Sequence, residues 1–271
     1  MNSSRHRFKK RFGQNFLQDR QVVERIITAA QLNADSSVVE IGPGRGALTE
    51  PLLAAAGKVL VCEVDPDLIR FWQQRALPNL EVVEGDVLEH DWITTFNAPP
   101  YKLVANLPYN ISTPILFKLI AHRELFSRLV LMFQREVGER LLAQPGGKDY
   151  GILSVLCQVW YDISKVVLVK PGAFYPPPKV DSLVLRFDPL AQPRFPLYGW
   201  EHFRRVVKAA FAQRRKSLRN TLTSGGWGRE EVAAALASAD IESGRRAETL
   251  SLVEFSRLSG ALAATGEEEE K

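Results

Sequence analysis

Three glycines follow a short β-branched run near residue 40. Residues 38–49 read VVEIGPGRGALT, so Gly42, Gly44 and Gly46 turn a buried strand into a helix. A turn of this kind lets the backbone approach a nucleotide closely. Gly42, Gly44 and Ala47 also satisfy the dinucleotide-binding spacing. The turn alone therefore fits a nicotinamide or flavin enzyme, another nucleotide-binding protein, or a glycine-rich turn without a ligand.

Two carboxylates stand at the ends of the next two expected strands. Glu63 comes about twenty residues after the glycine turn, where an acid accepts both hydroxyls of a ribose. This position suits NAD and S-adenosylmethionine equally. Asp86, in the sequence EGDV, is placed to accept a hydrogen bond from an adenine amino group, although an aspartate in a Gly-Asp turn can also be structural. Asp86 recurs in step with Glu63 and the glycines, which favours the functional interpretation.

The fourth strand is expected to end in Asn106, Leu107, Pro108 and Tyr109. The N6 amine of adenine is a poor nucleophile, because its lone pair is delocalised into the ring until acceptors hold its hydrogens. The side-chain oxygen of Asn106 and the backbone carbonyl of Leu107 could be those acceptors, and Tyr109 offers a stacking face for a base outside its helix. Taken by itself, the same tetrapeptide could be a capped turn.

Together with further blocks, these motifs resemble the ribosomal RNA adenine dimethyltransferase family along nearly the whole chain, and most closely the bacterial small-subunit enzymes within it. The matching blocks are residues 13–17 (GQNFL), the glycine turn, Glu63, Asp86, residues 106–109 (NLPY), residues 171–182 (PGAFYPPPKVDS) and residues 211–220 (FAQRRKSLRN). The resemblance implies an S-adenosyl-L-methionine-dependent enzyme that dimethylates N6 of two adjacent adenosines. The target would be the hairpin loop near the 3′ end of 16S rRNA, within the immature small (30S) ribosomal subunit.

The resemblance also implies residue roles. Cofactor binding would fall to Asn15 and Leu17 closing over the ligand, Gly42 and Gly44 admitting it, Glu63 on the ribose, Asp86 on the adenine, and Asn106. Catalysis would fall to residues 106–109, with Phe174 stacking on the flipped adenine opposite Tyr109, unless Phe174 only anchors its loop in the core. RNA contacts would come from Arg214, Arg215, Lys216 and Arg219, and from Lys179 if it does not simply face solvent.

Three alternatives remain open at this stage. A methylase of the same family could confer antibiotic resistance by acting on one adenine of 23S rRNA. A ribosome-assembly factor could bind immature subunits with methylation secondary or absent. A nicotinamide oxidoreductase would explain the glycine turn but neither Asp86 nor Asn106.

These motifs require a doubly wound α/β fold that brings strand ends together. Short β-branched runs predict strands at residues 38–41, 59–64, 80–84, 102–105, 129–133, 166–169 and 183–187. We therefore expect a Rossmann-like class I methyltransferase fold, with a seven-stranded mostly parallel sheet and helices on both faces. A helix with Asp19 as its cap should precede the first strand.

The expected domain division follows composition. Residues 1–187 would form the methyltransferase domain, with a basic arm at 1–20, and the proline-rich residues 188–197 would be a linker. Residues 198–262 would form a small all-helical docking domain, in which Phe203, Val207, Ala210 and Phe211 make an apolar stripe and Ser251 with Glu254 makes a capping box. Residues 263–271 would be an acidic tail.

Charge and composition narrow the class of protein. The net charge is +4, but basic residues gather at the start of the chain (Arg5, Arg7, Lys9, Lys10 and Arg11) and in the stretch 204–219, which favours nucleic acid as a partner. Cys62 and Cys157 suit buried thiols in a reducing compartment. The four histidines are isolated, so no metal is expected. With no run long enough for a membrane span and no signal peptide, we expect a cytoplasmic protein. We also expect a monomer, because no apolar helix stripe is left over once the two cores are filled.

Overall fold

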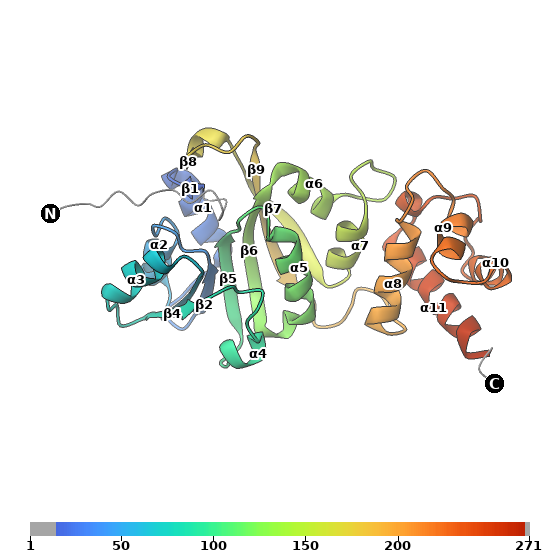
Figure 1. Cartoon of the computed structure of the whole chain (residues 1–271), viewed down its shortest axis with the longest axis horizontal. Coiled ribbons are helices and arrows are strands. Elements are labelled where there is room, and N and C mark those ends of the chain that lie inside the picture. The colour runs from blue at the N-terminus through green and yellow to red at the C-terminus, as the bar shows by residue number, and fades with distance from the viewer. Residues whose placement is uncertain (1–14, 269–271) are drawn as a thin grey trace. The chain divides into compact units, whose positions relative to one another are not determined.

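The computed structural model describes residues 15–268, and the chain separates into two compact units (Figure 1). The sheet unit comprises the residues up to Gly138 together with Asp162–Pro189, and the helical unit comprises Glu139–Tyr161 together with the residues from Leu190 onward. The predicted basic cluster at residues 5–11 and the first two residues of the GQNFL block lie outside the described residues. So do the last three residues of the expected acidic tail.

The sheet unit is built on a seven-stranded sheet of order β4-β3-β2-β5-β6-β9-β7. Its strands are β2 (Ser37–Ile41), β3 (Lys58–Glu63), β4 (Leu80–Glu84), β5 (Tyr101–Asn106), β6 (Phe126–Gln134), β7 (Tyr161–Val169) and β9 (Ser182–Pro189). Strands β2 to β6 pair in parallel, whereas β6 and β9 pair antiparallel. All seven strands predicted from the sequence are confirmed, and so is the Rossmann-like fold class.

Helices precede, connect and follow the parallel strands of the sheet (Figure 1). They are α1 (Arg20–Ala30), α2 (Thr49–Ala55), α3 (Pro66–Gln74), α4 (Trp92–Thr95), α5 (Ser112–Ala121) and α6 (Arg135–Leu142). The predicted cap is confirmed, because the carboxylate of Asp19 accepts hydrogen bonds from the backbone N–H groups of Gln21 and Val22. The central strand β2 is almost wholly buried, with Val38 and Val39 fully enclosed. Apolar burial of this sheet fixes where its strand ends lie.

The strand order reverses between β2 and β5. From β2 the chain continues outward through β3 and β4, and it then returns to place β5 on the other side of β2. At such a switch point the loops after the two strands leave in opposite directions and open a crevice at their carboxyl ends. The glycine turn follows β2, and the Asn106–Tyr109 segment begins at the end of β5. The fold therefore brings these two motifs to one crevice.

A second, two-stranded sheet was not predicted from the sequence. In it, β1 (Phe16–Leu17) pairs antiparallel with β8 (Phe174–Tyr175). The pair is extended by a hydrogen bond from the Gln18 backbone N–H to the Ala173 carbonyl, at 2.8 Å. This pairing joins the segment before α1 to the block of residues 171–182, more than 150 residues later.

The helical unit contains α7 (Ile152–Gln158), α8 (Trp200–Ala210), α9 (Leu218–Ser224), α10 (Arg229–Ser238) and α11 (Leu252–Glu268). The predicted apolar stripe forms part of its core, since Phe203, Val207 and Ala210 of α8 are buried. α11 continues through Glu268 and so extends into the range expected to be a tail.

The boundary between the units is less simple than the sequence-based division. The proline-rich segment is held by hydrogen bonds, from the Leu190 N–H to the Trp160 carbonyl and from the Arg194 N–H to the Val159 carbonyl, each at 2.9 Å. Residues 139–161 accordingly group with the helices, although the sequence placed them in the first domain. Proline content alone did not reveal these long-range contacts.

Candidate functional site

A cavity of about 460 Å³ lies at the carboxyl ends of β2, β3, β4 and β5. The cavity wall contains every residue predicted to bind the cofactor, namely Asn15, Leu17, Gly42, Gly44, Glu63, Asp86 and Asn106. It also contains Leu107, Pro108 and Tyr109 of the predicted catalytic motif. Four separate strand ends thus meet at one site.

The glycine turn forms the floor of this cavity through backbone that other residues would not adopt. Gly42 and Gly44 have φ angles of +73° and +54°, in the left-handed region that favours glycine. A Cβ at Gly44 would also lie 2.8 Å from the ring of Phe16. Trp72 of α3 fixes the turn through a hydrogen bond, in which its indole N–H donates to the Gly44 carbonyl at 3.0 Å. Trp72 was not predicted, and no sequence signal relates it to a residue 28 positions earlier.

The carboxyl groups of Glu40 and Glu63 are both buried, and both residues line the cavity. Glu40 of β2 is 2% exposed, and its Oε2 atom has no hydrogen-bond partner. Burial is the main cause that raises the pKa of Glu40 to about 8, and the nearby Glu63 adds to it. Glu40 was not predicted as a site residue, although a carboxylate inside the apolar run VVEI was a visible signal.

Glu63 ends β3 with its carboxylate partly held by its own turn. Its Oε1 accepts hydrogen bonds from the backbone N–H groups of Val64 and Asp65, both at 2.8 Å. Burial raises the pKa of Glu63, and these backbone donors oppose that rise. One carboxylate oxygen is therefore fixed by the chain, which orients the other for a ligand.

Asp86 follows β4 in a tight turn. Its Oδ1 accepts from the Leu88 backbone N–H at 2.9 Å, and its carbonyl accepts from the backbone N–H groups of Glu89 and His90. Gly85 precedes it at a φ of +114°. The turn presents the half-buried Asp86 carboxylate to the cavity.

The Asn106–Tyr109 segment is oriented by contacts at both ends. The side-chain Nδ2 of Asn106 donates to the Asn15 carbonyl at 3.1 Å, which leaves the Asn106 Oδ1 as a hydrogen-bond acceptor. The phenol of Tyr109 is 2.8 Å from the hydroxyl of the buried Ser182. Burial raises the pKa of Tyr109, so the phenol stays neutral and its ring is held by the Ser182 contact. An acceptor and an aromatic ring are thus fixed within one short segment.

Phe174 does not lie on the cavity wall. It is 3% exposed and packs in the same hydrophobic core cluster as Leu17, its partner across the β1–β8 pair. Phe174 is thus a core residue in this structure, and its stacking on a flipped adenine stays a prediction. Its neighbours Tyr175 and Lys179 are exposed.

The basic residues 214–219 of the helical unit are exposed, and one of them also forms an ion pair. Arg214 forms an ion pair with Glu248 and donates to the Lys148 carbonyl. Arg215, Lys216 and Arg219 are exposed around the start of α9. Arg214 is exposed as well, so all four residues present charge to solvent and Arg214 also contacts its own unit.

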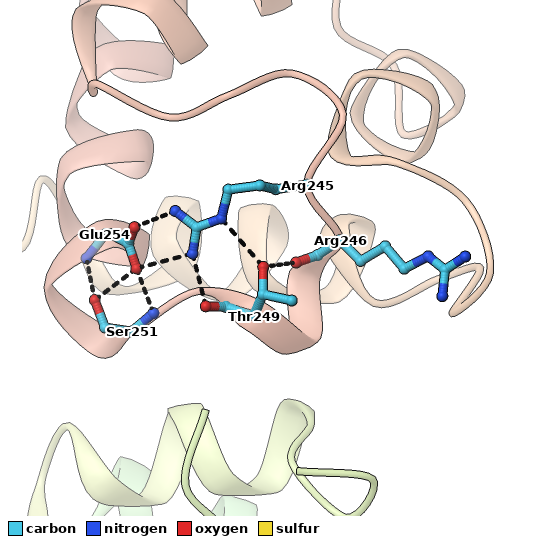
Figure 2. Close-up of polar contacts among 5 residues, drawn as sticks. All are labelled: Arg245, Arg246, Thr249, Ser251 and Glu254. Atoms are coloured by element: carbon cyan, nitrogen blue, oxygen red, sulfur yellow. Dashed lines mark hydrogen bonds and ion pairs between the residues drawn. The ribbon is translucent and has the colours of Figure 1, made fainter. Parts of the chain in front are cut away.

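Two further arginines of the helical unit, Arg245 and Arg246, are adjacent in the chain but differ in their contacts (Figure 2). Arg245 is tied to Glu254 and to Thr249, and Glu254 also completes the predicted capping box with Ser251. The guanidinium of Arg246 points away from this network and is exposed (Figure 2). The Arg245 carbonyl accepts from the Leu218 N–H at 2.8 Å, which brings this pair of arginines beside α9. Neither arginine was predicted.

The described part of the chain contains neither a cluster of metal ligands nor a membrane-spanning helix. Residues 15–268 hold no group of three or more histidine, cysteine, aspartate or glutamate side chains placed to bind a metal ion. None of the helices in that range has the length and apolar character needed to cross a bilayer. Both cysteines are buried as free thiols.

The fold and the site together define a Rossmann-like methyltransferase. Acids at the second and third strand ends suit an adenosine moiety, and the Asn106–Tyr109 segment supplies acceptors for an amine. The sequence profile of the family described as Ribosomal RNA adenine dimethylase matches residues 5–263. The chain belongs to this family, whose members use S-adenosylmethionine.

Individual relatives agree with this assignment. Ribosomal RNA small subunit methyltransferase A of Syntrophotalea carbinolica is 62% identical over 253 residues, which cover 93% of this chain and 96% of the relative. The protein of the same name from Geobacter sulfurreducens is 49% identical over 267 residues, covering 96% and 97% of the two chains. The family, enzyme class and cofactor predicted from the sequence are confirmed.

Two solved structures extend the comparison to three dimensions. A dimethyladenosine transferase from Plasmodium falciparum matches with a TM-score of 0.80 at 29% identity, covering 93% of this chain and 98% of that structure. The 23S rRNA methyltransferase ErmE matches with a TM-score of 0.69 at 28% identity, covering 92% and 100%. The higher structural similarity is to the dimethyladenosine transferase.

Proposed function

We propose that this chain transfers methyl groups from S-adenosylmethionine to N6 of two adjacent adenosines in the hairpin loop near the 3′ end of 16S rRNA. The substrate is the immature small ribosomal subunit. The observation that carries the proposal is the hydrogen bond from Asn106 to the Asn15 carbonyl, because it commits the Asn106 Oδ1 to accepting. The relatives that are 62% and 49% identical are small-subunit methyltransferases, which favours this target over 23S rRNA.

The residues of the cavity fit S-adenosylmethionine. Carboxyl groups of Glu40, Glu63 and Asp86 line a cavity that would receive a ligand carrying a sulfonium and an ammonium. The unpartnered Oε2 of Glu40 is an acceptor without a donor, and a positive ligand favours its ionised form. Glu63 would hold the ribose, Asp86 the adenine, and Gly42 and Gly44 would allow close backbone approach. When bound, the cofactor supplies an activated methyl group.

The residues around the target amine act through orientation and electrostatics. Asn106 Oδ1 and the Leu107 carbonyl accept the two amine hydrogens and draw the nitrogen lone pair out of the ring. Tyr109, anchored on Ser182, stacks on the flipped base. Pro108 restricts the backbone between them. No general base has to remove a proton beforehand, because the proton can leave the nitrogen after methyl transfer.

Docking of the ribosomal RNA falls to the exposed basic residues. Arg215, Lys216 and Arg219 are free of the ion pair that occupies Arg214, and phosphate contacts of this kind position an RNA without reading its sequence. Lys179 is exposed in the segment after β8 and can contact RNA phosphate in the same way. Specificity for the loop then comes from RNA shape and splayed bases.

The proposed setting is the cytoplasm, where small subunits are assembled, and the proposed active form is a monomer. On this view, the roles of assembly factor and methyltransferase belong to one protein.

The catalytic proposal is tested by Asn106→Ala, with Asn110→Ala as the matched control. Asn110 is an exposed asparagine on the same cavity wall, outside the proposed acceptor pair. Loss of the acceptor should lower kcat for methyl transfer by roughly 100-fold or more, the range seen for removal of one oriented hydrogen-bonding group. The control should transfer methyl at close to the wild-type rate. Wild-type kcat in Asn106→Ala would refute the proposed mechanism.

The docking proposal is tested by comparing Arg215→Ala/Lys216→Ala with Arg214→Ala. The double variant should weaken binding to small subunits and flatten its salt dependence, because two phosphate contacts are lost. Its affinity for S-adenosylhomocysteine should stay unchanged. Arg214→Ala should instead lower the thermal stability of the helical unit, since its ion pair with Glu248 is lost. Equal subunit affinity in the double variant and the wild type would contradict the proposal.

A further inference from the structure

Lys118 makes an unusual set of contacts for a lysine on a surface helix. It lies on α5, and its Nζ donates to the carbonyls of Val87, Leu88 and His90 at 3.3, 2.7 and 2.6 Å. An ammonium has three N–H donors, so these carbonyls use its full capacity. Its Nζ also lies 5.2 Å from the ring centre of Trp92.

All three acceptors belong to the turn that carries Asp86. This turn begins at the left-handed Gly85, and Asp86 itself accepts from the Leu88 N–H at 2.9 Å. Carbonyls that converge on one ammonium cannot move independently. The turn conformation that presents Asp86 to the cavity is therefore fixed from outside the cavity by Lys118.

The helix that carries Lys118 starts directly after the catalytic segment. The Ile111 N–H donates to the Pro108 carbonyl at 3.1 Å, and the Ser112 hydroxyl donates to the Tyr109 carbonyl at 3.0 Å. One rigid helix thus connects the segment proposed to hold the target amine with the turn proposed to hold the cofactor adenine. Lys118 makes the contact between this helix and the turn that carries Asp86.

The position of Lys118 also brings its positive charge near the carboxylates of Asp86 and Asp91. Lys118 is half-buried, and desolvation lowers its pKa, while the carboxylates of Asp86 and Asp91 oppose that change.

We propose that Lys118 is a positioning residue for recognition of the cofactor adenine, acting through the turn that it holds around Asp86. The inference rests on the proposed role of Asp86 as acceptor for the adenine amine. Lys118 touches neither the cofactor nor the target base. Its loss lets the turn relax, so that the protein distinguishes adenine less well from a purine without the amine.

The test measures affinity for two ligands by isothermal titration calorimetry. One is S-adenosylhomocysteine, and the other is its analogue in which hydrogen replaces the 6-amino group of the purine. In Lys118→Met the affinity for S-adenosylhomocysteine should fall about tenfold, as for loss of charged hydrogen bonds, while the analogue should lose much less. Lys118→Arg should restore most of the ratio. Lys102→Met is the matched control, because Lys102 is also half-buried and donates to a backbone carbonyl, that of Gln31, away from the cavity.

A double-mutant cycle with Asp86→Asn separates positioning from general stability. If Lys118 acts through Asp86, Lys118→Met should not change the ratio of the two affinities further in the Asp86→Asn protein. An unchanged ratio in a folded Lys118→Met protein, or an equal loss for both ligands, overturns the proposal. If Lys118→Met does not fold, Lys118→Gln replaces it, and an unchanged ratio in that variant overturns the proposal equally.

The cycle also distinguishes failure of this inference from failure of the proposed function. Wild-type discrimination by Asp86→Asn would remove the role of Asp86 and overturn the inference with it. A wild-type chain that bound neither S-adenosylhomocysteine nor S-adenosylmethionine would refute the proposed function itself.

Discussion

Replacing Glu40 by glutamine should change how the stability of the protein depends on pH. Glu40 is fully enclosed in β2, and its burial raises its pKa from the ordinary value of 4.5 to about 8. Glutamine has nearly the same size but does not titrate. The substitution therefore removes a pH-dependent contribution and leaves packing almost unchanged.

The sign of the effect follows from the direction of the shift. Between pH 4.5 and pH 8 the folded chain holds a proton on Glu40 that the unfolded chain has released. The free energy of unfolding of the wild type therefore falls as pH rises through this window. At about 1.4 kcal/mol per pH unit, the loss from pH 4.5 to pH 7 amounts to ~3 kcal/mol. Glu40→Gln lacks this loss, so it should gain that much on the wild type between pH 4.5 and pH 7.

Urea unfolding of both proteins at several pH values between 4 and 9 measures the difference. The unfolding is monitored with a probe in the sheet unit. Glu124→Gln is the control, because Glu124 is exposed. Its stability should run parallel to that of the wild type across the range. If Glu40→Gln also runs parallel to the wild type, Glu40 is ionised in the folded protein and the electrostatic account of the cavity is wrong.

Two further substitutions test the turn beneath the cavity and the network of the helical unit. Gly44→Ala should destabilise the fold by about 1–2 kcal/mol, because Gly44 has a φ of +54° and a Cβ there would lie 2.8 Å from the Phe16 ring. Urea unfolding at neutral pH measures this loss. A variant as stable as the wild type would contradict the predicted backbone strain at this position. Glu254→Gln should lower thermal stability at pH 7 but not near pH 2, since its hydrogen bonds with Arg245 lower the pKa of Glu254 from 4.5 to about 2 and that stabilisation is lost as pH falls through this range. A stability difference that persisted at pH 2 would show that the loss is not electrostatic.

Much of the sheet could be predicted from the sequence because its signals are local. The inner parallel strands β2 and β3 are short β-branched runs that are almost wholly buried. Parallel strands end at one edge of the sheet, so the order of motifs along the chain predicts that Gly42, Glu63, Asp86 and Asn106 surround one cavity, as they do.

The parts that escaped prediction depend on contacts between distant residues. The two-residue β1–β8 pair buries Phe174, and no local sequence signal indicates that these two distant segments pair. Arg214 looks like its basic neighbours, and no local pattern indicates its ion pair with the distant Glu248. The hydrogen bonds of Lys118 and Trp72 join residues about 30 positions apart, on helices whose patterns indicate only amphipathic packing.

The most direct test of the central claim is transfer of labelled methyl from S-adenosylmethionine to undermethylated small subunits, with large subunits and free 16S rRNA in parallel, followed by nucleoside analysis. We predict N6-dimethyladenosine in the small subunits at two adjacent positions, and its absence in the Asn106→Ala protein. Label in large subunits alone would contradict the proposed substrate, and no label in any of the three would contradict the proposed reaction.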